Sequence, residues 1–334
     1  MKNCIIKFTI QWTSQSHLEW LLKKTPNNSG IISRGGVNYE FKFDDDCKEC
    51  DYWFVWGGLP KEVDMLNTNC DKRNIFFVVE EAHTLRQYPG PFLDQFAGVL
   101  THRSDINHKK KIDIGHEYMT WQLKQSHDEL LSFTDIPKSK EISVICSDIF
   151  YLPGHRTRFA FVNRLIGHFK DRIDFFGRGL NPIDDKWNAL APYKYSICIE
   201  NSQIKGYFTE KISECYMAHC MPVYCGAPDI GSYFSPESYL EIDVNDYLGS
   251  IRKIEQLLEE DPYDKIVDLL KEEKAKYFKD YHIFPFIADF ISTQHRTDFK
   301  RQRIKIYNER VFEPNYNYKK AASAIKKVLY TKAD

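Results

Sequence analysis

The chain has 334 residues, of which 43% are hydrophobic and 28% are charged, and its formal net charge is −1. This hydrophobic content excludes an intrinsically disordered protein, and no apolar run approaches the roughly 18 residues of a membrane-spanning helix. A chain of this length usually forms two domains of about 150 residues each.

The first hundred residues alternate short apolar runs with helical patterns. Residues 6–10 alternate apolar and polar side chains as a strand does, and Leu18, Leu21 and Leu22 follow at helical spacing. Three further buried strands are predicted, over residues 51–58, 74–81 and 96–102. Strands separated by helices or loops predict a parallel sheet that is covered on both faces.

The N-terminal segment and the cysteines both indicate the cytoplasm. Lys7 and Gln11 interrupt the apolar stretch that a secretory signal peptide needs, so we expect a cytoplasmic protein. The nine cysteines are odd in number and scattered, a pattern typical of reduced thiols. Cys47 and Cys50 form a C-x-x-C pair without a second pair at zinc-site spacing. A surface loop is the first interpretation of this pair, and a metal site is the alternative.

A polar segment without periodicity, residues 135–141, is the predicted linker between two domains. After it, strands are predicted over residues 142–147, 173–179, 193–199 and 221–228, and helices over residues 158–169 and 247–260. The sequence therefore predicts an α/β protein with two Rossmann-like domains in tandem. The expected divisions are an N-terminal domain (1–137), a C-terminal domain (138–295) and a basic tail (296–334).

Residues 193–211, YKYSICIENSQIKGYFTEK, read as a strand, a loop and the start of a helix that Thr209 can cap. Residues 221–228 form the next strand, so a right-handed crossover places the loop at the carboxyl edge of the sheet, where ligands bind. The helix N-terminus and Lys211 favour a phosphate. Glu210 would repel a phosphate unless it accepts hydrogen bonds from a ribose diol. Alternatively, Glu210 only complements the helix dipole.

The stretch from residue 193 to residue 230 resembles the signature block of the α1,3/4-fucosyltransferases, glycosyltransferase family 10. That block is close to Y-K-F-x-L-x-F-E-N-S, followed by Y-x-T-E-K and by P-V-x-x-G-x-P. The resemblance implies a GT-B fold, in which two Rossmann-like domains face a central cleft. It also implies transfer of L-fucose from GDP-fucose with inversion, the C-terminal domain holding the nucleotide and the N-terminal domain the acceptor.

The resemblance assigns donor contacts to four residues of this block. Tyr207 matches the tyrosine that precedes the T-E-K triplet, and Asn201 matches the asparagine of E-N-S. Glu210 matches the glutamate that binds the ribose, and Lys211 matches the lysine that binds the diphosphate. The resemblance thereby favours the ribose interpretation of Glu210.

An arginine at the start of an early helix in the C-terminal domain completes the donor set of the family. It matches Arg158 in GHRTRFAF, which we expect in the first turn, and Arg156 is the near competitor. Its guanidinium would stabilise the charge of the departing GDP. With Lys211 and a helix N-terminus it would make a metal dispensable, and the aspartate run at residues 44–46 is predicted to lie in a polar loop.

Inverting transfer needs a carboxylate that takes the proton of the acceptor hydroxyl. Residues 74–83, NIFFVVEEAH, place two glutamates directly after a buried strand, where the family has a glutamate in a comparable motif. The match to IFFVVE predicts Glu80 as the base, with Glu81 as the second choice. The alternative is that both glutamates end the strand as surface acids. As neighbours, each could raise the pKa of the other.

The sequence therefore predicts an enzyme that moves L-fucose from GDP-fucose to a GlcNAc or glucose hydroxyl of an N-acetyllactosamine-type glycan. We expect an α1,3 linkage and a role in lipopolysaccharide O-antigen or related glycan synthesis. Two alternatives remain: a GT-B transferase with another nucleotide sugar, and a non-catalytic nucleotide-sugar or glycan-binding protein. The presence of Glu80, Glu210 and Lys211 argues against the second alternative.

The C-terminal tail is basic. Residues 296–334 contain 11 Lys and Arg against 4 Asp and Glu, and residues 318–332 place apolar side chains on one helical face with lysines beside it. Such a helix would either attach peripherally to an anionic membrane surface or pack across the domains. Nucleic acid is a weaker interpretation, because no known motif accompanies the charge.

Overall fold

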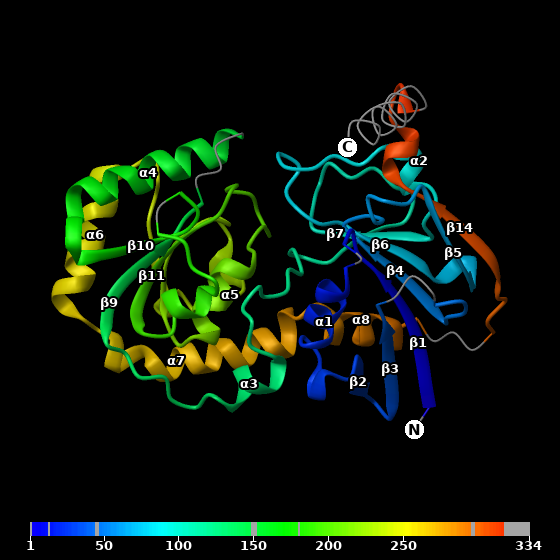
Figure 1. The fold of residues 1–334 in the computed structure, drawn as a ribbon, viewed down its shortest axis with the longest axis horizontal. Helices are drawn as coiled ribbons and strands as arrows, with labels where there is room; N and C mark the ends of the chain where they lie inside the picture. Colours follow the sequence, from blue (N-terminus) through cyan, green and yellow to red (C-terminus); the bar gives the residue numbers. More distant parts are fainter. Residues whose placement is uncertain are drawn as a thin grey trace, which may run out of the picture. The chain divides into compact units, whose positions relative to one another are not determined.

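The structure, a computed structural model, describes residues 2–12, 14–43, 47–147, 152–179, 181–294 and 298–316. They form two compact units (Figure 1). Unit 1 combines the residues up to 21, residues 33–114 and the segment from residue 298, and unit 2 combines residues 22–32 and 115–294. The predicted tail helix and the aspartates at 44–46 lie outside the described residues.

Unit 1 is built on a seven-stranded sheet in the order β2-β3-β1-β4-β6-β7-β8. Its strands are β1 (Lys2–Thr9), β2 (Ile31–Arg34), β3 (Val37–Lys42), β4 (Tyr52–Trp56), β6 (Ile75–Val78), β7 (Gly98–Thr101) and β8 (Lys111–Asp113). All pairs from β3 to β8 are parallel. The strands β4, β6 and β7 are buried along their whole length, as apolar strands of a covered parallel sheet should be. Two helices belong to this part of the chain, α1 (Gln15–Leu22) and α2 (Gly90–Leu93).

The segment from residue 298 belongs to unit 1. Its strand β14 (Gln302–Tyr307) pairs antiparallel with β5 (Met65–Cys70), and a 3₁₀ turn follows over Glu309–Phe312. Tyr307 also exchanges two backbone hydrogen bonds with the side chain of Gln95, at 2.9 and 2.8 Å. The described part of the predicted tail is therefore a strand of the N-terminal unit.

Unit 2 is built on a five-stranded parallel sheet in the order β10-β9-β11-β12-β13. Its strands are β9 (Lys140–Ile145), β10 (Ile173–Phe176), β11 (Tyr193–Ile199), β12 (Met221–Cys225) and β13 (Leu240–Glu241). Its helices are α3 (His127–Ser132), α4 (Pro153–Phe169), α5 (Glu210–Met217), α6 (Tyr247–Glu260), α7 (Tyr263–Lys276) and α8 (Ile283–Ser292), with a π-helical turn at Tyr277–Tyr281.

The helices of unit 2 pack in pairs. The helices α4 and α6 run side by side (Figure 1), where the Arg164 guanidinium lies 3.5 Å from the centre of the Tyr247 ring. Helix α7 packs near the end of α5, where the Tyr263 hydroxyl donates to the carbonyl of His219 at 2.8 Å. A single hydrophobic core joins these helices to the sheet. Among the described helices, none combines the length and the hydrophobicity that crossing a membrane requires.

Unit 2 begins earlier in the chain than the predicted boundary at residue 137. Trp121 is fully buried in its core, and the hydroxyl of Tyr277 donates to the carbonyl of Met119 at 3.0 Å. Residues 115–137 therefore pack with the second sheet. The predicted linker leads directly into β9, which starts at Lys140.

Candidate donor site and candidate base

The sheet of unit 2 changes direction between β9 and β11. From β9 the chain passes through α4 to β10 on one side, and from β11 it passes through α5 to β12 on the other. Such a reversal opens a crevice outside the carboxyl ends of the two strands, where open α/β sheets bind ligands. The start of α4 and the loop of residues 200–209 flank this position.

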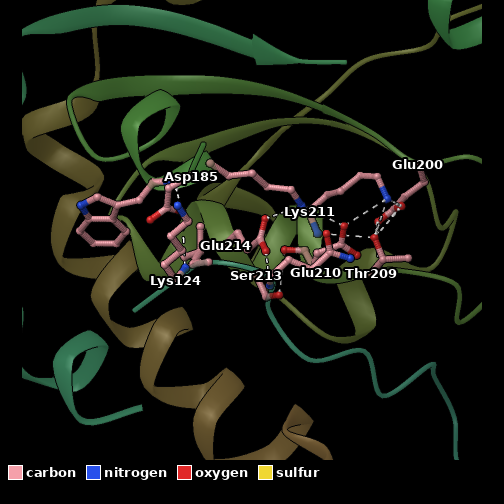
Figure 2. A network of polar contacts seen from close by, with 12 residues as sticks. Lys124, Asp185, Glu200, Thr209, Glu210, Lys211, Ser213 and Glu214 are labelled. Atoms are coloured by element: carbon pink, nitrogen blue, oxygen red, sulfur yellow. Dashed lines mark hydrogen bonds and ion pairs between the residues drawn. The ribbon is translucent and has the colours of Figure 1, made fainter. Parts of the chain in front are cut away.

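Glu200, Thr209 and Lys211 form an ionic cluster where that loop meets α5 (Figure 2). The Lys211 Nζ atom lies 3.0 Å from Glu200 Oε2 and donates to Thr209 Oγ1 at 2.8 Å. The backbone N–H of Thr209 donates to Glu200 Oε1 at 2.8 Å. The Glu200 side chain is fully buried, whereas 23% of the Lys211 side chain is exposed. The cluster thus fixes an ammonium group in the first turn of α5 and leaves it accessible to an anion.

The charge of Lys211 is secured by its neighbours. Burial alone would lower the pKa of the Lys211 ammonium, but the carboxylates of Glu200 and Glu210 outweigh it and raise the pKa. The group therefore carries a full positive charge at neutral pH, beside helix N–H groups that also favour an anion.

Glu210 is buried and ionised because Lys186 and Lys211 lie beside it. Lys186 Nζ is 3.1 Å from Glu210 Oε1 and 3.0 Å from Glu214 Oε2. Burial would raise the pKa of Glu210, but the ammonium groups of Lys211 and Lys186 lower it to about 2. The pKa of Glu214 is raised instead, chiefly by burial. Glu210 is therefore ionised at neutral pH, which is the state that accepts hydrogen bonds from ribose hydroxyls.

Arg158 lies beside Asn201, as the family match expects of two donor residues. Its Nη1 donates to Asn201 Oδ1 at 2.6 Å, and its Nη2 donates to Ser147 Oγ at 3.2 Å. Its buried Nε has no hydrogen-bond partner among the described residues. Since α4 begins at Pro153, Arg158 lies in the second turn rather than the predicted first. Arg156 is exposed, so Arg158 is the arginine of this helix that is buried against Asn201.

Gly154 allows α4 to approach the loop after β11. A Cβ atom at Gly154 would lie 1.9 Å from the backbone oxygen of Asn201, whereas one at Gly167 of the same helix would meet nothing within 4 Å. Gly154→Ala is therefore expected to separate α4 from the loop and to destabilise the fold by about 2 kcal/mol. Gly167→Ala is the matched control and should stabilise by up to about 1 kcal/mol. Urea unfolding of both variants checks this, and equal effects would contradict the close approach.

Tyr207 lies in the loop before α5, and its side chain is fully buried. Its backbone N–H donates to the carbonyl of Ile204 at 3.0 Å. The adjacent Gly206 has a φ of +71° and donates its N–H to Asp229 Oδ1 at 2.8 Å. The carbonyl of Gly206 accepts from the N–H of Glu117 at 3.0 Å. Tyr207 is thus a core residue of a loop that is anchored on both sides.

Three charged residues near the start of α5, Glu200, Glu214 and Lys186, are absent from the predicted site residues. Glu200 stands directly before Asn201 in the E-N-S motif, so the motif itself offered a signal for it. Glu214 follows Glu210 by one helical turn, which puts the two carboxylates on one face of α5. Lys186 comes from the turn between β10 and β11, and no sequence pattern links it to α5.

In unit 1, Glu80 lies at the carboxyl end of the sheet and is buried, with 5% of its surface exposed. Gln11 Nε2 donates to Glu80 Oε2 at 3.2 Å, and Arg86 Nη1 lies 3.5 Å from the same oxygen. Burial raises the pKa of Glu80 from its ordinary value of 4.5 to about 7, against the lowering effect of Arg86. Glu81 is only partly buried and has a φ of +70°. Glu80 is therefore the carboxylate whose environment suits a base near neutral pH.

Two glycines make room for Glu80 and for Arg86 beside it. Gly57 follows β4 with a φ of +71°, and a Cβ atom there would lie 2.1 Å from Glu80 Oε2. Gly58 has a φ of +151°, and its Cβ would lie 2.8 Å from Arg86 Nη2. The pair after β4 thus forms a backbone cradle for the carboxylate and its arginine.

No group of three or more His, Cys, Asp or Glu side chains within the described ranges is arranged to hold a metal ion. None of the nine cysteines, all of which lie in the described ranges, forms a disulfide.

Comparisons with known proteins show similarity in sequence and in fold. Residues 136–282 match the sequence model of the family described as glycosyltransferase family 10 (fucosyltransferase) C-term. The chain is 38% identical over 60 residues to an α-(1,3)-fucosyltransferase of Helicobacter pylori. That alignment covers 18% of this chain and 13% of the relative, so it spans only a small part of either protein.

Solved structures extend the likeness to most of the chain. A crystal structure of an α1,3-fucosyltransferase covers 89% of this chain and 91% of its own, with a TM-score of 0.53 and 17% identity. A structure of such an enzyme with GDP gives a TM-score of 0.54 at 18% identity, covering 89% of this chain and 92% of its own. The predicted fold class is thereby confirmed: the chain has the GT-B fold of two Rossmann-like units. Residues 136–282, which include the start of α5, are similar to the C-terminal region of glycosyltransferase family 10, the fucosyltransferases.

Proposed function

We propose that this protein transfers L-fucose from GDP-fucose to a hydroxyl group of a glycan. The observation that carries the proposal is the buried ionic cluster at the start of α5. It fixes the accessible ammonium of Lys211 beside the ionised carboxylate of Glu210, within the region that matches the fucosyltransferase family. An ammonium group can bind the diphosphate of a nucleoside diphosphate, and a carboxylate can accept hydrogen bonds from the hydroxyls of its ribose.

The donor residues divide the work of leaving-group stabilisation. Lys211 and Arg158 are assigned to the diphosphate. Their positive charges would stabilise it more strongly as the bond from the sugar breaks, because negative charge then builds up on the leaving GDP. Glu210 is assigned to the ribose hydroxyls, and Asn201 holds the Arg158 guanidinium through its side-chain oxygen. Tyr207 is assigned to the shape of the loop.

Glu80 is assigned the role of general base. It removes the proton from the acceptor hydroxyl while the oxygen forms its bond to the anomeric carbon of fucose, and GDP departs with the electrons of the broken bond. Attack from the face opposite GDP inverts the configuration at that carbon. The raised pKa of Glu80, about 7, suits proton transfer at neutral pH.

The acceptor is proposed to be a GlcNAc or glucose unit of an N-acetyllactosamine-type glycan, joined through an α1,3 linkage. The name of the Helicobacter pylori relative supports this linkage. Synthesis of lipopolysaccharide O-antigen at the inner membrane surface, with the basic tail as a peripheral attachment, is the proposed setting.

A donor panel tests the proposal. The purified protein is incubated with N-acetyllactosamine and, in separate reactions, with GDP-fucose, GDP-mannose or UDP-galactose, and the products are weighed by mass spectrometry. We expect one deoxyhexose to be added from GDP-fucose alone. Transfer from another nucleotide sugar would instead support a different donor. Binding of GDP-fucose without transfer to any member of a glycan array would support a non-catalytic binding protein.

A further inference from the structure

The surroundings of Glu80 include a carboxylate from the far end of the chain. Glu309, in the turn after β14, places its Oε1 2.6 Å from Arg86 Nη2. The other arm of the same guanidinium, Nη1, lies 3.5 Å from Glu80 Oε2. One arginine therefore serves two carboxylates, and its shorter contact is with Glu309.

The turn that carries Glu309 is firmly attached to unit 1. Asn308 is buried, and its Nδ2 donates to the carbonyls of Pro60 and Val63 at 2.9 and 3.0 Å. Its backbone N–H donates to the carbonyl of Asp64 at 2.8 Å. Gly58 supplies the space, since a Cβ atom there would lie 3.0 Å from Glu309 Oε2. Glu309 is thus held against Arg86 by the packing of the segment that includes β14.

Charged and titratable groups act on Glu80 from several elements. They are Arg86 and Glu81 from the stretch after β6, Tyr88, whose hydroxyl donates to the Glu80 carbonyl at 2.9 Å, and Glu309 from the turn after β14. Arg103, after β7, donates to the carbonyls of Glu81 and Arg86 at 3.1 and 2.9 Å. Burial raises the pKa of Glu309 itself, Arg86 and Lys61 lower it, and Glu313 raises it. Arg86 is the cation nearest to Glu80, so whatever holds Arg86 controls how strongly the Glu80 carboxylate is stabilised.

We propose that Glu309 is a positioning residue for the base: it holds the Arg86 guanidinium in its shorter contact and so leaves Glu80 able to accept a proton. Without Glu309, Arg86 is free to close on Glu80 as a bidentate partner, the geometry that guanidinium and carboxylate prefer. Glu80 would then be a stabilised carboxylate and a weaker base. This inference rests on the proposed role of Glu80 in transfer.

The electrostatic effects on the pKa of Glu80 agree with this role of Glu309. Burial is the main cause that raises the pKa of Glu80, and Glu309 raises it further, whereas Arg86 lowers it. Removing Glu309 should therefore lower the pKa of Glu80, and removing Arg86 should raise it. Opposite shifts separate this arrangement from a merely structural role of the ion pair, which gives the two variants the same effect.

The test compares Glu309→Gln, Arg86→Gln and the control Asp298→Asn. Asp298 lies in the same segment and pairs with Arg73 at 3.5 Å, but it is 69% exposed at its side chain and does not contact Glu80 or Arg86. The protein is labelled with ¹³C at the glutamate carboxyl carbons, and the Glu80 resonance is identified by its loss in Glu80→Gln. This titration needs no turnover, so it stands whether or not fucose is transferred.

In the wild type we expect Glu80 to titrate at about pH 7. In Glu309→Gln the midpoint should fall by about one pH unit or more, in Arg86→Gln it should rise, and in Asp298→Asn it should not move. The acid limb of kcat/KM should shift in the same directions, with a severalfold lower maximal rate in Glu309→Gln. A midpoint that is unchanged in Glu309→Gln, or that moves in the same direction in both variants, would overturn the inference. Matching shifts in a protein that transfers no fucose would leave this arrangement standing and refute the proposed function.

Discussion

Glu80→Gln is expected to lower the rate of fucose transfer by about 10²- to 10⁴-fold while GDP binding is retained. Glutamine keeps the size of the side chain and its contact with Gln11, but it cannot take a proton from the acceptor. Glu81→Gln is the matched control, since this neighbouring carboxylate is less buried and should retain transfer. Initial rates and GDP titrations of both variants provide the check. A loss of transfer in Glu81→Gln alone would assign the base to Glu81.

The same substitution should make the fold more stable at alkaline pH. Glu80 has a pKa of about 7 in the folded chain against an ordinary value of 4.5, so folding favours its protonated form. The contribution to stability is complete below pH 4.5 and is lost as the pH rises through 7. Glu80→Gln should therefore gain about 3 kcal/mol over the wild type at pH 8 and much less at pH 5. Urea unfolding at the two pH values measures this difference, and an equal difference at both would contradict the buried environment of Glu80.

Lys211→Met is expected to destabilise the protein by about 3 kcal/mol, because it leaves the fully buried carboxylate of Glu200 without its cation. Thr209 continues to donate two hydrogen bonds to Glu200. The expected loss of stability is therefore at the lower end of the range for a broken buried ion pair. The variant should also bind GDP at least about tenfold more weakly, since a charge-assisted contact to the diphosphate is lost. Urea unfolding and calorimetric titration with GDP measure the two effects.

Two further variants separate the causes of these losses. Lys140→Met removes an exposed ion pair with Asp174 in the same unit and should change stability by no more than about 0.5 kcal/mol. In the double variant Lys211→Met with Glu200→Gln, much of the lost stability should return because the unpaired charge is gone, but GDP binding should stay weak. A double variant as unstable as Lys211→Met would contradict the pairing of Glu200 with Lys211.

Local sequence patterns were sufficient to predict the strand, helix and strand around Lys211. The strand, helix and strand from Tyr193 to Cys225 follow one another directly, so apolar runs, the cap at Thr209 and the crossover rule together place Lys211 at the carboxyl edge of the sheet. The buried strand β6 that precedes Glu80 follows from the same kind of local pattern, whereas the burial of Glu80 itself depends on its contacts with Gln11 and Arg86.

Contacts between distant parts of the chain could not be predicted in this way. Lys186 reaches Glu210 from a turn with no periodic relation to α5, and Trp121 joins the core of unit 2 from before the predicted linker. The segment of Glu309 looked like part of a basic tail because its charge is evident in the sequence, whereas its pairing with β5 depends on side chains more than 200 residues away. Antiparallel pairing over such a distance leaves no local signal.

Titration with GDP tests the central claim, that the start of α5 is a nucleoside-diphosphate site. Wild type and Glu210→Ala are compared by calorimetry, with Glu255→Ala on the exposed face of α6 as the control and thermal unfolding as the check on folding. We predict that the wild type and the control bind GDP alike, and that Glu210→Ala binds at least about tenfold more weakly because the ribose hydroxyls lose their charged acceptor. Unchanged GDP affinity in a folded Glu210→Ala would contradict the account.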